Sequence, residues 1–220
     1  KKEYEGDKVD ITMHLKKSGT SDHYFLNKYD AFLQKEGMAA SIKQTFYVSQ
    51  ENKYTLKEAY NLLAGRPVFK NLVSKEGNEY QAWVKLNPSK VLENGNHELK
   101  QYSQNYGFDL DKTLTKYPIK ELLNHEYNAS LKDSLHRGNM QKVTFVDKAG
   151  KEEKLYVSPN ITLGALNVYD QNKQRLPTEK LVEKHYISKE MADQLKERVA
   201  KLSQEQKPEQ KPEQKKQQQA

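Results

Sequence analysis

Short apolar segments separated by glycine turns recur along the chain, and one pattern occurs twice. Residues 62–87 and 135–160 align without a gap at an offset of 73 positions. In each copy a short helical stretch ends at a glycine, a residue that favours the left-handed conformation found after many helices. Two apolar segments with a turn sequence between them follow, which is typical of a β-hairpin. The identical pairs are Leu62/Leu135, Gly65/Gly138, Val73/Val146, Lys75/Lys148, Gly77/Gly150, Glu79/Glu152, Val84/Val157 and Asn87/Asn160.

The regions on either side of these copies extend the same organisation. Residues 15–19 resemble the hairpin turn, so the N-terminal region is a candidate degenerate third repeat. After Ser188, an acceptable N-cap, apolar residues recur every three or four positions, which predicts a helix. A Gln/Lys/Pro/Glu-rich segment follows and buries too little apolar surface to be ordered. The expected parts are an N-terminal strand and hairpin region (1–54), helix–hairpin units (55–110 and 111–176), a C-terminal helical segment (177–202) and a disordered tail (203–220).

We predict an α+β fold in which repeated helix–β-hairpin units form small antiparallel sheets. One such unit buries little apolar surface alone, so the units should pack together. Only 35% of the residues are hydrophobic, but 14 Tyr, 6 Phe and one Trp supply anchors for a core. The chain does not begin with Met and shows no signal peptide, so we expect a fragment or a processed product.

Composition excludes several classes of protein. No apolar run approaches the ~18 residues that a membrane-spanning helix needs, so we expect no membrane partner. The absence of cysteine excludes disulfide scaffolds, thiol nucleophiles and cysteine-based zinc sites. A reducing, cytoplasmic location fits this composition.

The balance of charge suggests an anionic partner. The chain has 37 basic and 30 acidic residues, a formal net charge of +7 and a pI near 9.2. Only four of the basic residues are arginine. Lysine contacts phosphates as a point charge without reading sequence, so this composition favours binding to single-stranded DNA or RNA that is independent of sequence. A solvated surface with no such partner is the alternative.

Aromatic residues that alternate with lysines on the predicted strands are the candidate nucleic-acid contacts, since stacking and backbone charge hold single strands. Trp83 lies among polar neighbours on its strand face, whereas Ala82 and Val84 share the other face. The alternative is that Trp83 and Tyr156, which occupy equivalent repeat positions, both fill the core. The candidate contacts are Arg66, Tyr80, Trp83, Lys85, Lys100, Tyr102, Arg137, Lys154 and Tyr156.

One motif resembles a catalytic signature. Residues 109–114 read Asp-Leu-Asp-Lys-Thr-Leu, the Asp-x-Asp-x-Thr-Leu pattern of haloacid-dehalogenase-type phosphatases. In those enzymes the first Asp is the nucleophile and ends a buried apolar strand, but here the preceding residues are polar. We therefore expect Asp109 or Asp111 to cap a helix over 112–123, with Phe108 packing against it.

No other residues form a catalytic or cofactor-binding pattern. The six histidines lack metal-ligand spacing, and neither common glycine-rich nucleotide loop occurs. Serines lie outside any Gly-x-Ser-x-Gly context. We therefore predict a protein that is not an enzyme and that needs no metal or cofactor.

Several strings resemble a known family. They are residues 54–66 (YTLKEAYNLLAGR), 75–87 (KEGNEYQAWVKLN), 105–110 (NYGFDL), 116–122 (KYPIKEL) and 167–170 (NVYD). Over about residues 22–176 the chain resembles an uncharacterised domain family of Bacteroidetes proteins encoded on conjugative and other mobile elements. The resemblance implies a mobile-element context, often beside DNA-processing genes, and no established activity.

Together these observations favour a non-catalytic accessory module of a mobile-element protein that binds nucleic acid largely independently of sequence. The alternative is a protein–protein interaction or scaffolding module without nucleic-acid binding. A continuous positive groove would favour the first hypothesis, and evenly mixed charge would favour the second. The sequence leaves the oligomeric state open.

Overall fold

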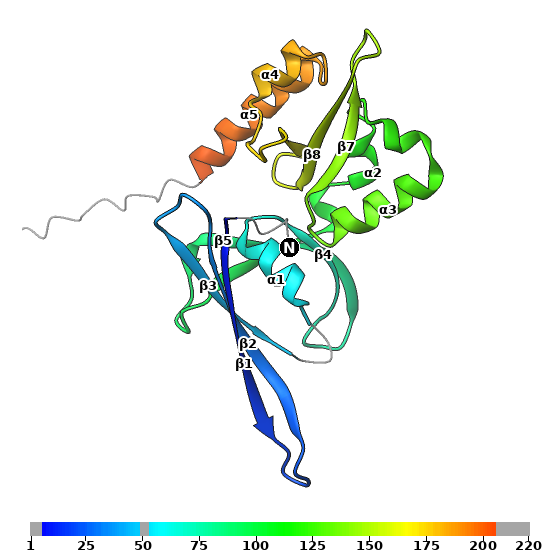
Figure 1. Cartoon of the computed structure of the whole chain (residues 1–220). Coiled ribbons are helices and arrows are strands. Elements are labelled where there is room, and N and C mark those ends of the chain that lie inside the picture. The colour runs from blue at the N-terminus through cyan, green and yellow to red at the C-terminus, as the bar shows by residue number, and fades with distance from the viewer. Residues whose placement is uncertain (1–5, 49–52, 206–220) are drawn as a thin grey trace, which may run out of the picture.

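Three small antiparallel sheets separated by helices make up the described part of the protein. The computed structural model describes residues 6–48 and 53–205. Each sheet has three strands whose order follows the chain: β1-β2-β3, β4-β5-β6 and β7-β8-β9 (Figure 1). The α+β class with repeated small antiparallel sheets, predicted from the sequence, is confirmed.

The first sheet forms the N-terminal region. It contains β1 (Lys8–Lys17), β2 (Tyr24–Gln34) and β3 (Ser41–Tyr47). The predicted turn at residues 15–19 coincides with the end of β1 and the hairpin tip. This long β1–β2 hairpin projects away from the rest of the molecule (Figure 1).

The two copies of the repeat share the end of the helix and the start of both hairpin strands. In the first, α1 (Leu56–Leu63) is followed by β4 (Val68–Val73), β5 (Glu79–Val91) and β6 (His97–Ser103). In the second, α3 (His125–His136) is followed by β7 (Gln141–Val146), β8 (Glu152–Asn160) and β9 (Ala165–Tyr169). Both helices end, and both hairpin strands begin, at positions 73 residues apart. The helix-then-hairpin pattern predicted for residues 62–87 and 135–160 is therefore present in both copies.

Helices differ from the sequence prediction where a turn interrupts them. The helix expected over 112–123 is two pieces, α2 (Leu110–Leu114) and the 3-10 helix η3 (Lys120–Leu123), preceded by the 3-10 turn η2 (Gln104–Tyr106). Pro118 lies between the pieces, and proline lacks an N–H and disfavours helical backbone in the residue before it. The expected C-terminal helical segment is likewise α4 (Thr178–Glu183) and α5 (Lys189–Glu205).

The boundary of the predicted tail also moves. His185 has a positive φ of 57° at the turn between α4 and α5, and the Met191 amide donates to Ser188 Oγ (3.2 Å) where α5 begins, as expected of an N-cap. Residues 203–205 belong to α5, and the rest of the predicted tail lies outside the described residues. No helix of the described part is long and apolar enough to span a membrane.

The middle sheet is covered on both faces. Ala82, Val84 and Leu86 of β5 pack into a first core with buried residues of β2, β3 and α1. Trp83 of the same strand packs into a second core with residues of α2, α3, the β7–β9 sheet, α4 and α5. Because side chains alternate along a strand, β5 supplies both cores.

Hairpin tips are capped by their own side chains. The Ser74 hydroxyl accepts from the Asn78 amide (3.2 Å), and Asp147 Oδ1 accepts from the Lys151 amide (2.9 Å) at the equivalent turn. Gly77 and Gly150 have positive φ values of 83° and 80°, and a Cβ added at either would meet nothing within 4 Å. These tips therefore extend into open space.

Candidate interaction surfaces

Trp83 does not lie on an exposed platform. Only 4% of the residue is exposed. Its ring centroid lies 5.3 Å from that of Phe69, 5.4 Å from Phe108 and 5.4 Å from His136. The core-packing alternative therefore describes Trp83, and its ring is not available to stack on a base.

The covering residues come from elements that the local sequence of β5 does not reveal. Phe108 precedes α2, and His136 ends α3. The polar neighbours Gln81 and Lys85 share the Trp83 face, so alternation along one strand gave no sign of this cover. Phe108 was recognisable only as a residue that packs against a nearby helix.

Two further candidate contacts, Tyr102 and Lys85, are buried or half-buried. Tyr102 is buried, and its ring stands edge-on to Tyr106 with centroids 4.6 Å apart. Lys100 Nζ lies 5.3 Å from the Tyr102 ring, which is a cation–π distance. Lys85 is half-buried, and burial together with the nearby Arg175 charge lowers the pKa of its ammonium group.

The other candidate aromatic residues are more open. Tyr80 is exposed and donates from its hydroxyl to Gln101 Oε1 (2.7 Å) on β6. Tyr156 on β8 is half-buried. Lys142 Nζ lies 5.8 Å from the Tyr156 ring. The candidate Lys154, which is close to Tyr156 in sequence, is exposed. These residues belong to different sheets, so the candidate contacts do not come from a single sheet.

The two candidate arginines lie at a joint between the repeats. Arg66 Nε donates to the Gly138 carbonyl (2.9 Å), and its Nη2 donates to Asn61 Oδ1 (2.6 Å). Asn61, which is fully buried, donates to the Arg137 carbonyl (2.8 Å) and to Asn139 Oδ1 (3.0 Å). The helix-to-strand turns of both copies therefore meet here, and the Arg66 guanidinium is used in the joint. Only the Arg137 side chain is exposed.

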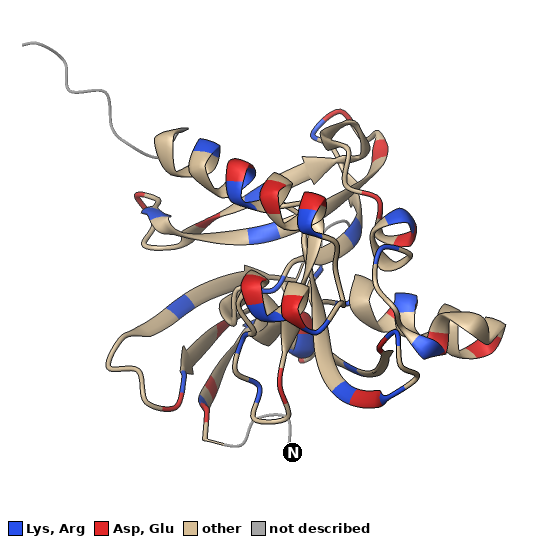
Figure 2. Ribbon diagram, turned by 90° about the horizontal axis from the view of Figure 1, so that it is seen from above, with Lys and Arg blue, Asp and Glu red and all other residues tan. Residues whose placement is uncertain are grey.

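Positive charge is mixed with negative charge over the described surface. Figure 2 shows basic and acidic positions interspersed along the strands and helices. Many lysines pair with carboxylates on neighbouring elements. Examples are Lys70–Glu58 (3.0 Å), Lys90–Glu98 (2.6 Å), Lys132–Asp111 (2.8 Å), Lys184–Glu153 (2.6 Å), Lys196–Glu179 (3.1 Å) and Lys120–Glu152.

The projecting β1–β2 hairpin carries four large exposed apolar side chains. Met13 is 56%, Leu15 62%, Tyr24 61% and Phe25 60% exposed. Lys16 pairs with Phe25, and Leu15 pairs with Leu26, across the two strands. Tyr24, opposite Lys17, shares the face of Met13 and Leu15, whereas Phe25 points to the other face. Exposed apolar side chains on a projecting element are a common mark of an interaction surface.

The two faces of this hairpin differ. Val9 and Ile11 pack on the first core, and Met13 and Leu15 continue the same face beyond it, because β1 is regular and its side chains alternate. We call this row of four residues the apolar stripe. The register shift opposite His14/Leu15 falls at Asn27 on β2, which has no partner in β1.

A polar network centred on Asp30 holds the opposite face at the base of the hairpin. Asp30 accepts from Thr45 Oγ1 (2.7 Å) and pairs with Lys43 Nζ (3.1 Å) and His14 Nε2 (3.3 Å). The Thr45 hydrogen bond, followed by those of Lys43 and His14, lowers the pKa of Asp30 to about 2 against a smaller opposing effect of burial. The three strands are therefore joined where the hairpin leaves the body.

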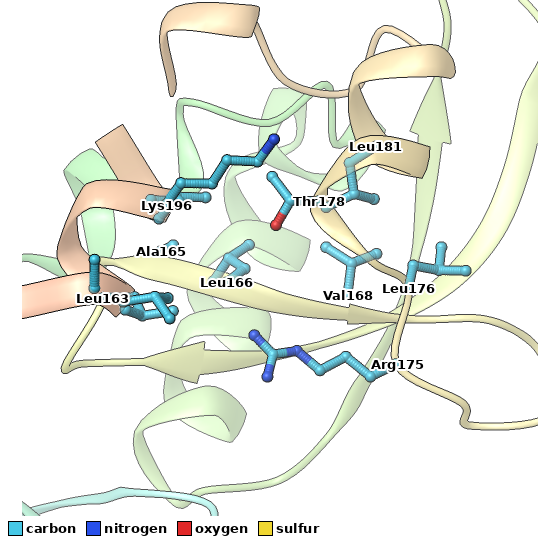
Figure 3. Close-up of a pocket in the computed structure, with 12 residues that line it drawn as sticks. Leu163, Ala165, Leu166, Val168, Arg175, Leu176, Thr178, Leu181 and Lys196 are labelled. Carbon is cyan, nitrogen blue, oxygen red and sulfur yellow. The ribbon is translucent and has the colours of Figure 1, made fainter. Parts of the chain in front are cut away.

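A second candidate is a pocket of about 280 Å³ between β9, α4 and α5. Its floor is apolar and is formed by Leu166 and Val168 of β9, and Leu181 of α4 lines another side (Figure 3). Lys196 and Arg175 lie on opposite sides of this floor in Figure 3, and Lys196 pairs with Glu179. Leu166, Val168, Leu176 and Leu181 belong to the second core and Leu195 packs against it, so the pocket borders this core where α5 lies against the third sheet.

The phosphatase-like motif is a helix cap. Asp109 Oδ1 accepts from the Lys112 amide (3.0 Å) at the N-terminus of α2, and Phe108 packs on the second core. Asp111 is exposed and pairs with Lys132 of α3. Across residues 6–48 and 53–205, no group of three His, Cys, Asp or Glu residues could hold a metal ion. The cap expected at Asp109 is confirmed.

In comparisons with known proteins, no family model, no curated protein and no solved structure matches this chain. The resemblance to mobile-element proteins therefore stays a prediction from the sequence.

Proposed function

We propose that the chain is a non-catalytic protein-interaction module that engages its partner through the projecting β1–β2 hairpin. The observation that carries this proposal is the exposure of the outer part of the apolar stripe, Met13 and Leu15, together with Tyr24 and Phe25. These side chains add nothing to either core, and water-exposed apolar area of this kind is stabilised by burial against a partner.

The distribution of charge and aromatic residues favours a protein over nucleic acid as the partner. Trp83 and Tyr102 are buried, the Arg66 guanidinium is used internally, and many lysines are paired with carboxylates. Single-strand binding uses exposed aromatic rings along a positive groove. The two observations that favoured nucleic acid, exposed aromatic residues and an excess of positive charge, are thus weakened.

Site-specific photo-cross-linking tests the proposal. A photoreactive benzoylphenylalanine replaces Phe25 on the hairpin, and in a matched control it replaces Tyr127, an exposed aromatic residue of α3. After irradiation of cells that produce the protein natively, we expect protein adducts from position 25 and not from position 127. Equal adducts from both positions, or none from position 25, would contradict the proposal.

A parallel titration with a fluorescent single-stranded oligonucleotide separates the alternative. We expect no binding at low ionic strength. Affinity that falls steeply with salt would instead support the nucleic-acid hypothesis, because phosphate contacts release counterions.

A further inference from the structure

The outer edge of β1 is the open edge of the first sheet. The other outer strand, β3, is covered at Gln44, whose side chain donates to the His97 carbonyl (3.2 Å) and accepts from the His97 amide (2.8 Å). Asn96 Oδ1 also accepts from the Thr45 amide (2.9 Å). In the described part of the chain, β1 pairs only with β2. An open strand of this length is a template for pairing with another strand.

We propose that the hairpin's partner is a second copy of this chain, which pairs antiparallel with β1 so that Met13 lies opposite Met13 of the second copy. This inference rests on the proposed function of the hairpin. The two sheets would then join into one six-stranded antiparallel sheet about a two-fold axis, the commonest symmetry of homo-oligomers.

Strand geometry restricts the possible registers. Residues opposite each other in an antiparallel pair point to the same face, and the backbone groups of alternate residues point outward from an edge. Two copies of β1 related by a two-fold axis therefore place one residue opposite its own copy. Thr12, Met13 and His14 are the central choices in a strand that runs from Lys8 to Lys17.

The register centred on Met13 matches apolar residues and opposite charges. Ile11 lies opposite Leu15 of the second copy, which extends the apolar stripe across the two-fold axis. On the other face, Asp10 lies opposite Lys16 of the second copy, and symmetry provides this pair twice. Within its own chain, the Asp10 carboxylate has a long ion pair of 3.8 Å with Lys8 Nζ, and both side chains are exposed. Asp10 is therefore accessible to Lys16 of the second copy. Such cross-strand pairs stabilise an antiparallel ladder.

The neighbouring registers are less complementary in charge, although centring on Thr12 would pair Val9 with Leu15 and Ile11 with Met13. Centring on Thr12 places Lys8 opposite Lys16 of the second copy, a like-charge pair that destabilises the ladder. Centring on His14 places Ile11 opposite Lys17 of the second copy and moves Asp10 away from every lysine. The central register places Val9 opposite Lys17 of the second copy, but of the three registers it alone pairs Asp10 with a lysine and contains no like-charge pair.

Single cysteines test the register directly, because the chain contains none. Opposed residues in an antiparallel pair have Cα atoms about 4.5–5.5 Å apart, within the span of a disulfide. Under mild oxidation we expect Met13→Cys to form a covalent dimer and Thr12→Cys and His14→Cys, the matched controls, to form little. A dimer that is strongest for either control, or absent for all three variants, would overturn the register.

Charge exchange tests the same contact without oxidation. Asp10→Lys places like charges opposite each other, so we expect it to raise the dimer dissociation constant by about tenfold in sedimentation velocity. The double variant Asp10→Lys/Lys16→Asp exchanges the charges and should restore the wild-type value. A double variant as weak as Asp10→Lys would overturn the pairing, and circular dichroism confirms that each variant is folded.

The outcomes separate this inference from the function on which it rests. If the wild-type chain stays monomeric at high concentration while position 25 cross-links a different protein, self-pairing is overturned and the proposed function stands. Adducts between two copies of the chain support both. A monomer whose hairpin forms no adducts overturns both.

Discussion

Gly65 and Gly138 hold equivalent positions in the repeat but have different surroundings. Both have positive φ, 82° and 79°, so an alanine at either is strained by about 1–2 kcal/mol. A Cβ at Gly65 meets nothing, whereas at Gly138 it would lie 2.8 Å from the Pro67 carbonyl oxygen and 3.0 Å from Asn61 Cβ. The sequence predicts the left-handed turn at both positions but not the joint, because the joint depends on how the two units pack.

The joint makes the two glycines unequal in stability. We expect Gly65→Ala to lower the free energy of unfolding by the backbone strain alone. Gly138→Ala should cost a further 1–3 kcal/mol, about the penalty of overpacking a tight site. Urea denaturation of both variants measures the difference, and equal losses would show that the joint yields without cost.

His136 makes stability depend on pH. It lies between the rings of Phe69 (4.9 Å between centroids) and Trp83, and burial lowers the pKa of its imidazole below the ordinary 6.5. The unfolded chain therefore binds a proton more readily than the folded chain, so stability is present above pH 6.5 and is lost as pH falls through the folded pKa. We expect His136→Phe to flatten this dependence in denaturation curves, whereas His125→Phe, on the exposed first turn of α3, should retain it.

At the scale of elements, the strands and turns follow closely from the sequence. Glycine turns at fixed spacing predicted both repeat hairpins, and Thr55 forms the N-cap of α1 in a capping box with Glu58. Helix lengths were less predictable. Pro118 gave the available signal for the break between α2 and η3, and the helical spacing of apolar residues after it concealed the break.

α2 provides a test of the cap at the phosphatase-like motif. Asp109→Ala leaves the Lys112 amide without its acceptor, so we expect a loss of about 1 kcal/mol in the free energy of unfolding. Asp109→Asn keeps an acceptor and should be near wild type. Thermal denaturation measures both variants. A Mg²⁺-dependent phosphatase activity that Asp109→Asn abolishes would refute the assignment of this residue as a cap.

At the scale of the whole molecule, β5 couples the two cores. Ala82 and Val84 belong to the first core and Trp83 to the second. Detachment of β5 would therefore disrupt both cores together. The burial of Trp83 depends on α2 and α3 covering the second face of the middle sheet. The exposure of the β1–β2 hairpin likewise depends on tertiary packing, because the hairpin extends beyond the residues that form the first core. Local sequence patterns indicate neither the burial of Trp83 nor the exposure of the hairpin. For this reason the sequence placed the candidate site on β5, whereas the structure favours the hairpin.

This coupling predicts one cooperative unfolding transition. The fluorescence of Trp83, the single tryptophan, reports the second core, and far-UV circular dichroism reports the whole fold. We expect the two curves to coincide. Trp83→Ala should cost about 3–5 kcal/mol and shift the entire transition seen by circular dichroism. Tyr80→Ala, at an exposed position on the same strand, should change stability by about 0.5 kcal/mol or less. Separate transitions would show that the cores unfold independently.

The open hairpin tips indicate where the chain can accept inserted residues. Gly77 and Gly150 point into empty space, and lengthening a surface loop has only a small entropic cost. The helix-to-strand turn at Gly138 has no such room, because Pro67 and Asn61 close around it. Inserted residues are therefore tolerated at the tips and rejected at the joint. A peptide tag placed at either tip should leave the protein folded, whereas the same tag at the joint should separate the two repeats.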